Sequence, residues 1–469
     1  TTDLTATGTT TLAGASTSAD ITFGDNDKAI FGAGSDLQIY HNANNSYVQD
    51  VGTGKLHITS DGTGVSIDKG TSELMATFDT DGAVTLYYDN AAKLATTVTG
   101  IDITGTAVTD GLTVAGNLSV DGGTIKLDGN YPTGTGNVAL GDAALASGSL
   151  SGGDNTAIGF QALTTNTSGS VNTAVGSDAL RYNTTGANNV SMGVNALKQN
   201  TSGSYNTGLG RDALTANTTA SNNTAVGYKA GYNNTTGAQH VAIGYQASYS
   251  NTTGTDNTVV GGNALYTNTT GNYNLASGYA SLRLNTTGSN NVGLGYEALR
   301  SNTTASDNTA VGYQALYANT TASGSVAVGR ASAASNTTGV NTSVGDYSLN
   351  SNTTGSNNVA LGKQALQLNT TASNNTAVGY QAGYANTTGA DITAIGYQAL
   401  DSNTTGNYNT AIGLSALQSN TTANSNTAVG RRAMFGNSTG GDNVGLGYHA
   451  MYSNTTGSSN VSIGKDALF

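Results

Sequence analysis

Apolar and polar residues alternate in short runs that recur at a fixed interval along most of the chain. A triplet such as Thr-Ala-Val or Val-Ala-Ile is followed each time by a glycine, and positions in a repeat are numbered below from this reference glycine. It recurs every 17 residues, apart from one step of 18 at the start and one of 16 between Gly329 and Gly345. Twenty copies extend from about residue 136 to residue 469. A fixed period of this length predicts a solenoid.

Positions −3 to −1 predict a short β-strand. Position −1 is Val, Ile, Leu or Met in nineteen of twenty copies, position −3 is Thr or Val in nineteen, and position −2 is Ala, Gly or Ser except at Val259. This alternation has the period of two that a strand requires. A second short strand is expected from +3 to about +7, before the turn Asn-Thr-Thr-Gly. The sequence therefore predicts an all-β parallel β-roll or β-helix of about twenty 17-residue coils.

The small residues at −2 predict the close approach of another backbone. A solvent-facing strand would accept Lys, Glu, Gln or Arg there, and none occurs. One interpretation is a homo-oligomer in which this column faces the same column of a partner chain. The alternative is packing against the coil's own interior. The expected interface residues are Ala157, Ala174, Ala225, Ala242, Ala310, Ala327, Ala360, Ala377, Ala394, Ala411 and Ala428.

Residues 1–135 predict a separate β-rich attachment region, with the repeat shaft as a second domain over 136–469. Alternating runs at 36–40 (DLQIY) and 83–89 (AVTLYYD) are separated by turn signals rich in Asp and Gly. Pro132 is the only proline and lies just before the repeats, where a junction is expected.

Charge and composition exclude several classes of function. The net charge is −12, and residues 1–135 hold 16 acidic and 5 basic side chains against 12 and 11 in the repeats. Neither part has the basic footprint of a nucleic-acid-binding protein. There is no Cys, and no apolar run is long enough to span a bilayer. The chain starts at Thr1 rather than Met, which predicts a processed or truncated N-terminus.

No residues with catalytic, cofactor-binding or metal-ligating spacing are found, so an enzyme is not expected. The four histidines, His41, His57, His240 and His449, share no metal-ligand spacing and are expected at the surface. Calcium-binding β-rolls need an Asp in every turn, whereas these turns carry Asn and Thr.

Two repeated features suggest surface chemistry. Tyr recurs at +1 and +5, and stacked coils would turn these residues into aromatic ladders that either rigidify the roll or bind glycans. Asn at +7 is followed two residues later by Ser or Thr in every copy that has it, which forms an N-glycosylation sequon. A turn alone also explains this Asn. The candidate glycosylation sites are Asn166, Asn183, Asn200, Asn217, Asn234, Asn251, Asn268, Asn285, Asn302, Asn319, Asn336, Asn352, Asn369, Asn386, Asn403, Asn420, Asn437 and Asn454.

The repeats resemble the head repeats of trimeric autotransporter adhesins. The strings NTAIGFQAL at Asn155 and NTAVGYQAL at Asn308 carry the likeness, with NVALG at Asn137 and NVSIG at Asn460. The resemblance implies a left-handed parallel β-roll with three chains side by side. The family's coils are commonly shorter than 17 residues, and the extra residues here would lie in the Asn-Thr-Thr-Gly turn.

The N-terminal part resembles segments of marine phage structural proteins. The likeness lies in GSDLQIYHNANNSYVQDVGTGKLHI (34–58), LYYDNAAKLATTVTGIDITG (86–105) and GLTVAGNLSVDG (111–122). Such segments precede tail-fibre and appendage shafts, which a self-cleaving chaperone often follows. No chaperone is found here, so it is expected either to have been cleaved away or to be missing from an incomplete chain.

These patterns together predict a non-enzymatic homotrimeric fibre, most like a phage tail fibre or virion appendage that projects from the virion or adheres to a host surface. The expected partners are further copies of the chain, a host-surface glycan or receptor, and other virion proteins at the N-terminus, with no nucleic acid, membrane span or cofactor. The expected location is extracellular, on the virion surface. The alternatives are a bacterial trimeric surface adhesin on the cell surface, or an extracellular filament that carries glycans.

Overall fold

The computed structural model describes residues 21–105 and 135–469, and every regular element in these ranges is a β-strand. The chain divides into two compact units, Thr1–Gly122 and Gly123–Phe469. This division lies before the boundary expected between residues 135 and 136. Pro132 and the segment 111–122 lie outside the described residues.

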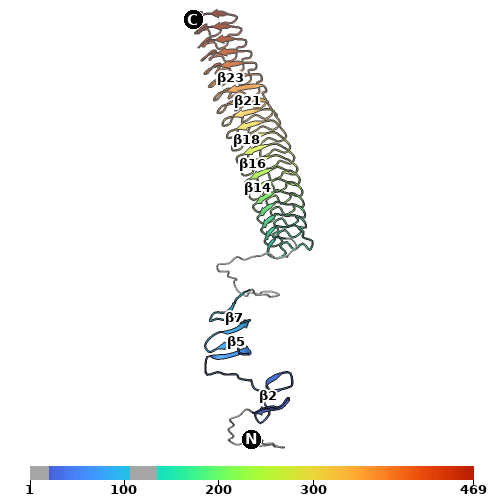
Figure 1. The fold of residues 1–469 in the computed structure, drawn as a ribbon. Helices are drawn as coiled ribbons and strands as arrows, with labels where there is room; N and C mark the ends of the chain where they lie inside the picture. Colours follow the sequence, from blue (N-terminus) through green and yellow to red (C-terminus); the bar gives the residue numbers. More distant parts are fainter. Residues whose placement is uncertain (1–20, 106–134) are drawn as a thin grey trace, which may run out of the picture. The chain divides into compact units, whose positions relative to one another are not determined.

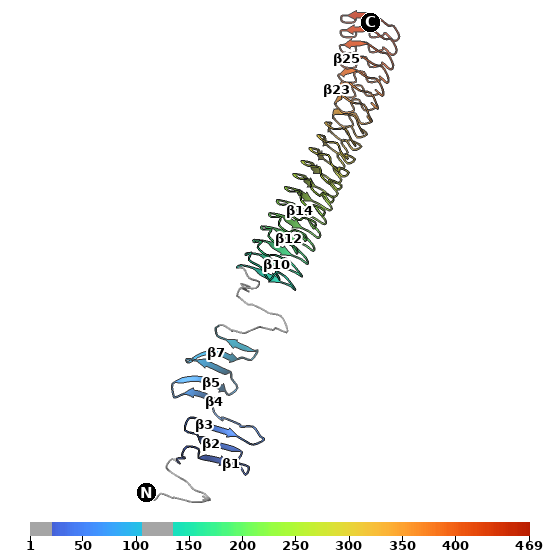
Figure 2. The same cartoon turned by 90° about the vertical axis from the view of Figure 1, so that its right-hand side faces the viewer.

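The described part of the first unit contains two antiparallel meanders (Figures 1 and 2). One sheet has the order β1-β2-β3 and the other has the order β4-β5-β6-β7-β8. Their bounds are β1 (Lys28–Phe31), β2 (Leu37–His41), β3 (Ser46–Asp50), β4 (Gly64–Lys69), β5 (Glu73–Asp79), β6 (Val84–Tyr88), β7 (Ala91–Thr96) and β8 (Ile101–Ile103). The expected β-rich region is therefore present in the described residues.

The second unit is a parallel β-solenoid with one strand in each coil, and the strands lie above one another along the shaft (Figure 1). Each strand pairs in parallel with the equivalent residues of the next coil, as Thr156 pairs with Thr173. Among the described strands, β9 pairs only with β10 and β28 only with β27. The strands are β9 (Val138–Leu140), β10 (Thr156–Ile158), β11 (Thr173–Val175), β12 (Val190–Met192), β13 (Thr207–Leu209), β14 (Thr224–Val226), β15 (Val241–Ile243), β16 (Thr258–Val260), β17 (Leu275–Ser277), β18 (Val292–Leu294), β19 (Thr309–Val311), β20 (Val326–Val328), β21 (Asn341–Val344), β22 (Asn358–Leu361), β23 (Thr376–Val378), β24 (Thr393–Ile395), β25 (Thr410–Ile412), β26 (Thr427–Val429), β27 (Val444–Leu446) and β28 (Val461–Ile463).

The reference glycine ends each strand because no other residue fits its backbone. Gly159 has φ +130°, a conformation that residues with a side chain rarely adopt. A Cβ at Gly159 would also lie 2.6 Å from the carbonyl oxygen of Gly176 in the next coil. The same two constraints recur along the shaft, which accounts for the invariant glycine in the repeat.

The predicted second strand at +3 to +7 is wrong. Positions +2 and +4 adopt the left-handed conformation, with φ +55° at Gln161 and +52° at Leu163. The backbone still bonds to neighbouring coils: the Leu163 N–H donates to the Ala179 carbonyl at 3.0 Å, and the Gln161 N–H donates to the Asp142 carbonyl at 2.9 Å. This segment therefore follows a winding path rather than an extended one, while keeping its backbone groups paired.

The interior of the shaft is narrow and is filled from three positions. Residues at −2 and +3, mostly Ala, and at +4, mostly Leu, form one continuous buried cluster along the stack. The −2 position faces the +4 side chain of the preceding coil, because a Cβ on Gly208 would lie 3.2 Å from Cγ of Leu197. A long side chain at +4 thus leaves room only for a small one at −2.

One coil is a residue shorter than the others. Between Gly329 and Gly345 the missing residue belongs to the corner that precedes the strand. Strand pairing remains in register, with Val326 opposite Thr342 in the next strand. The corner therefore absorbs the deletion without shifting the sheet.

Candidate binding surfaces of the shaft

The alanines predicted to form an oligomer interface lie inside the single chain. Ala157, Ala310 and the nine others of that set have no exposed surface. Their size is explained by the interior packing against +4, so the assignment of position −2 to a contact between chains is wrong.

The predicted glycosylation sites form a buried asparagine ladder. Seventeen of the eighteen have no exposed surface, and Asn454 is half-buried. The Asn302 Nδ2 atom donates to Oδ1 of Asn285 at 2.8 Å and to the carbonyl of Ala305 at 2.9 Å. A glycan would have to be attached to this same nitrogen. The folded coil has no room for it, so the prediction of glycans at these positions is wrong for this fold.

A second asparagine ladder, which the sequence analysis does not predict, lies at position −4. The backbone N–H of Asn172 donates to Oδ1 of Asn155 in the preceding coil at 3.0 Å. The amides of Asn155 and Asn166 both donate to the carbonyl of Gly169, at 3.0 and 2.8 Å, so the two ladders meet at one corner. The signal was available, because Asn occupies −4 in seventeen of twenty copies.

His240 replaces Asn in the −4 ladder and is buried, so the expectation that it lies on the surface is wrong. Neither ring nitrogen has a hydrogen-bond partner. Burial without a partner disfavours the charged ring and lowers the pKa of His240 to about 4. His41 and His57 are exposed and His449 is half-buried. The residues described by the structure contain no group of three His, Cys, Asp or Glu side chains able to hold a metal ion.

The tyrosines at +1 and +5 form the expected stacks. Tyr279, Tyr296 and Tyr313 stack with ring centroids 5.5 and 5.4 Å apart. Tyr232, Tyr249 and Tyr266 do so at 5.2 and 5.1 Å. Their faces are turned toward one another, so the rings present edges and hydroxyl groups to solvent. This geometry favours the rigidifying role over face-on binding of sugars.

The outward side chains at −3 and −1 of β9–β28 form a long surface that is here called the sheet face. It contains no charged residue in twenty copies. Its apolar side chains are partly exposed, at 37% for Ile158, 38% for Ile243 and 36% for Ile395. Of its 40 side chains 28 are apolar and the other 12 are Thr or Ser. An uncharged and largely apolar strip of this length is rare on a protein that acts alone.

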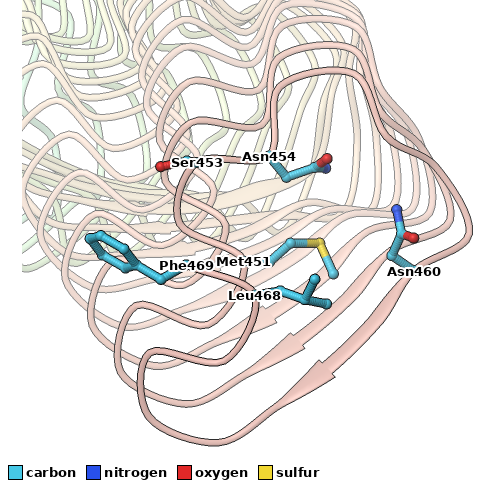
Figure 3. A pocket seen from close by; sticks show the side chains of 6 residues that line it. All are labelled: Met451, Ser453, Asn454, Asn460, Leu468 and Phe469. Atoms are coloured by element: carbon cyan, nitrogen blue, oxygen red, sulfur yellow. The ribbon is translucent and has the colours of Figure 1, made fainter.

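The hollow at the last described coil displays a cross-section of the shaft (Figure 3). Met451 and Leu468 come from the interior position +4, and Asn454 and Asn460 come from the two ladders. Ser453 and Phe469 complete its lining. In earlier coils the next coil covers these positions, so the hollow has the chemistry of the stack itself rather than that of a small-molecule site.

The comparisons with known proteins give no relative. No family model, no curated protein and no solved structure matches the chain. Within the described ranges, none of the elements is a helix long and apolar enough to cross a bilayer. The class that the fold defines is a parallel β-solenoid with a short β-rich N-terminal region.

Proposed function

We propose that the protein is a non-enzymatic structural fibre, a phage tail fibre or virion appendage whose shaft is built from parallel copies of this chain. The sheet face is the single observation that carries the proposal. It runs along all twenty coils with the same uncharged chemistry. A second copy has a matching surface with the same repeat.

The size of the sheet face is sufficient for stable association. Twenty coils at a strand spacing of about 4.8 Å give a length of roughly 90 Å, and a strip about 10 Å wide covers roughly 900 Å² on each chain. Stable interfaces bury about 800 Å² from each partner. The sheet face alone therefore reaches this area against one partner copy, and in a trimer each chain would divide it between two partners.

The N-terminal sheets give independent support for self-association. In residues 21–105 the only buried side chains are Ala76 and Thr85. Large apolar residues such as Phe31, Val48 and Phe78 are 44–58% exposed. Sheets with so little core gain too little from burial to balance the entropy of ordering the chain. Contacts with further copies would supply the missing core.

Three is the number of chains that the resemblance to trimeric adhesins implies. A bacterial surface adhesin with the same assembly is the second candidate, since the sheet face serves either protein equally. The fibre would project from a particle or cell and present its sides to a surface. A glycan-coated filament loses support, because the sequon amides are engaged inside the fold.

Native mass spectrometry of the full chain tests the assembly. A complex of three chains, each near 46.8 kDa, is expected. A monomer at micromolar concentration would contradict the proposal. Immunogold labelling with an antibody raised against the shaft separates the two candidates, because it places the protein on phage particles or on cell envelopes.

A further inference from the structure

The residues at position −5 lie at the corner before each strand. Together they form a surface column that is here called the corner column. Its backbone is left-handed in almost every coil, with φ +57° at Asn188 and +62° at Asp307. From Asp154 on, every corner N–H except that of Val340 donates to a carbonyl of the preceding coil, as Asn188 does to Ser170 at 3.0 Å. Asn, Asp and Gly tolerate this conformation best, and twelve of the twenty corner residues are of these types.

Three tyrosines occupy this column against the conformational preference. Tyr205, Tyr273 and Tyr408 have φ +59°, +56° and +59°. A bulky residue in the left-handed region costs conformational energy, and here the inter-coil hydrogen bond of the corner imposes that conformation. Nothing in the packing repays it, because the three side chains are 63%, 62% and 65% exposed.

The three rings are free of partners within the part of the chain that the structure describes. None stacks on another aromatic ring, lies beside a cation, or has a hydrogen bond to its hydroxyl. The tyrosines at +1 and +5 differ in this respect, because their faces are covered by stacking. Tyr205, Tyr273 and Tyr408 thus offer open aromatic faces.

Their placement along the shaft is regular. Tyr205 and Tyr273 are four coils apart, and Tyr273 and Tyr408 are eight coils apart. At about 4.8 Å for each coil, these separations are roughly 19 and 38 Å. In all three tyrosines the backbone N–H donates to a carbonyl oxygen of the preceding coil, at 3.0 to 3.1 Å. The rings therefore recur at multiples of one interval along a single column.

The neighbours in the column are polar groups suited to hydroxyl recognition. Asn188 and Asn222 flank Tyr205. An Asp precedes each of the other two tyrosines, and Asn290 or Ser425 follows. A sugar ring has an apolar face that packs on an aromatic ring and a hydroxyl edge that bonds to amides and carboxylates. The column holds five Asp and no Lys or Arg, which disfavours an anionic ligand.

We infer that the corner column binds a neutral polysaccharide lying along the shaft, with Tyr205, Tyr273 and Tyr408 each stacked on a sugar ring. This inference deepens the proposed fibre function and rests on it, because it assigns the ligand class of an adhesive side. The unstacked corner tyrosines, rather than the stacked tyrosine ladders, are assigned to glycan binding.

The test replaces the three corner tyrosines by the residue that the column itself prefers. Tyr205→Asn, Tyr273→Asn and Tyr408→Asn are combined in one variant. Retention of the full chain is measured on immobilised mannan, galactan and dextran as neutral probes, and on alginate and heparin as anionic probes. The wild type is expected to be retained on at least one neutral probe and on neither anionic probe. The triple variant should lose at least about tenfold in affinity, since it lacks three aromatic contacts.

A second triple variant is the matched control. Tyr232→Asn, Tyr249→Asn and Tyr266→Asn make the same chemical change in a stacked ladder, and retention should remain as in the wild type. The two variants should rank oppositely in binding and in melting temperature. The corner variant should melt no lower than the wild type because it removes strain, whereas the ladder variant should melt at a lower temperature. This ordering shows that lost binding in the corner variant is not lost folding.

Three outcomes overturn the inference: no retention on any neutral probe, equal retention of the corner variant and the wild type, or stronger retention on the anionic probes. Native mass spectrometry of the same samples separates this failure from failure of the proposed fibre. An intact complex without glycan retention contradicts the ligand alone.

Discussion

At the scale of single residues, side-chain volumes in the shaft interior compensate for one another. A larger side chain at −2 or −4 occurs where the +4 residue of the preceding coil is smaller, and a smaller one occurs where it is larger. Val259, the only large residue at −2, follows a coil with Ser248 at +4 in place of Leu. Gly445 at −2 follows Met434, whose Cγ would lie 2.7 Å from an added Cβ. Ile392 at −4 follows Gly383 and fills the space beside it. The interior thus tolerates exchange of volume between positions but not its net increase.

A double-mutant cycle tests this compensation. Ser248→Leu alone should overpack the coil and cost about 1–3 kcal/mol. Val259→Ala alone should leave a cavity with a similar cost of roughly 1–3 kcal/mol. The double variant recreates the usual Leu and Ala pair and should recover most of the loss. Hydrogen exchange of the amides in β15–β17 measures the local free energy. Additive losses would contradict direct packing between the two positions.

The buried His240 makes one coil sensitive to pH. Its pKa is about 4 in the folded chain, below the ordinary value of 6.5. Between these values the unfolded chain binds a proton that the folded chain does not, so stability falls as the pH falls through this window. The loss should level off at about 3 kcal/mol below pH 4.

The matched control is His240→Ile. His240 and Ile392 both occupy position −4, and each follows a coil with Gly at +4, Gly231 and Gly383 respectively. Hydrogen exchange of the surrounding coil, corrected for intrinsic rates, should show weaker protection at low pH in the wild type only. Equal sensitivity in both proteins would assign the effect to other groups, such as surface carboxylates.

At the scale of one coil, part of the architecture could be predicted and part could not. The period of two at −3 to −1 predicted the strand, because alternation is a direct property of extended backbone. The segment around Leu163 also contains small and large apolar residues in order, which led to the expectation of a second strand. Its left-handed residues are Gln and Leu, types that give no local signal for that conformation. The inter-coil hydrogen bonds impose it.

The candidate surfaces were predicted less well than the fold. The sequence offers the +7 Asn residues as candidate glycosylation sites or as turn residues, whereas a column of Asn is equally what a buried amide ladder requires. Small residues at −2 fit both a narrow interior and a contact between chains, because smallness alone does not distinguish the two. The joint change at Val259 and Ser248 could have decided it from the sequence.

The asparagine ladder at +7 is expected to hold the coils together. Asn302→Ala removes two donated bonds and leaves the amide of Asn319 without its acceptor at 2.9 Å. The cost should be about 2–4 kcal/mol, confined to the adjacent coils. Amide exchange in β18–β20 measures it.

Thr304→Ala, an exposed residue of the same turn, is the control for this prediction and should cost less than about 0.5 kcal/mol. Similar losses in both variants would indicate that the turn, rather than the amide ladder, determines the local stability.

At the scale of the whole molecule, the sheet face is where a second copy is expected to pack. Ile243→Lys combined with Ile395→Lys places two charges on this face without entering the interior. The variant should remain folded as a single chain and lose most of its assembly, because a desolvated unpaired charge is costly in an interface. Sedimentation or native mass spectrometry reads the stoichiometry, and circular dichroism reads the fold.

Thr236→Lys combined with Thr388→Lys is the matched control for assembly, since both residues are exposed in the Asn-Thr-Thr-Gly turn. This variant should assemble as the wild type does. If the sheet-face variant also assembles normally, the sheet face is not the interface and the fibre proposal loses its main support.

The short coil between Gly329 and Gly345 has a consequence for engineering. Chain length changes there while strand pairing and the interior column continue without a shift. The N–H of Asn357 even keeps its acceptor across the shortened corner, bonding to the carbonyl of Val340 at 2.7 Å. We therefore expect the corner before the strand to accept grafted foreign peptides. Repeated over successive coils, it would make the shaft a display scaffold with attachment points about 4.8 Å apart.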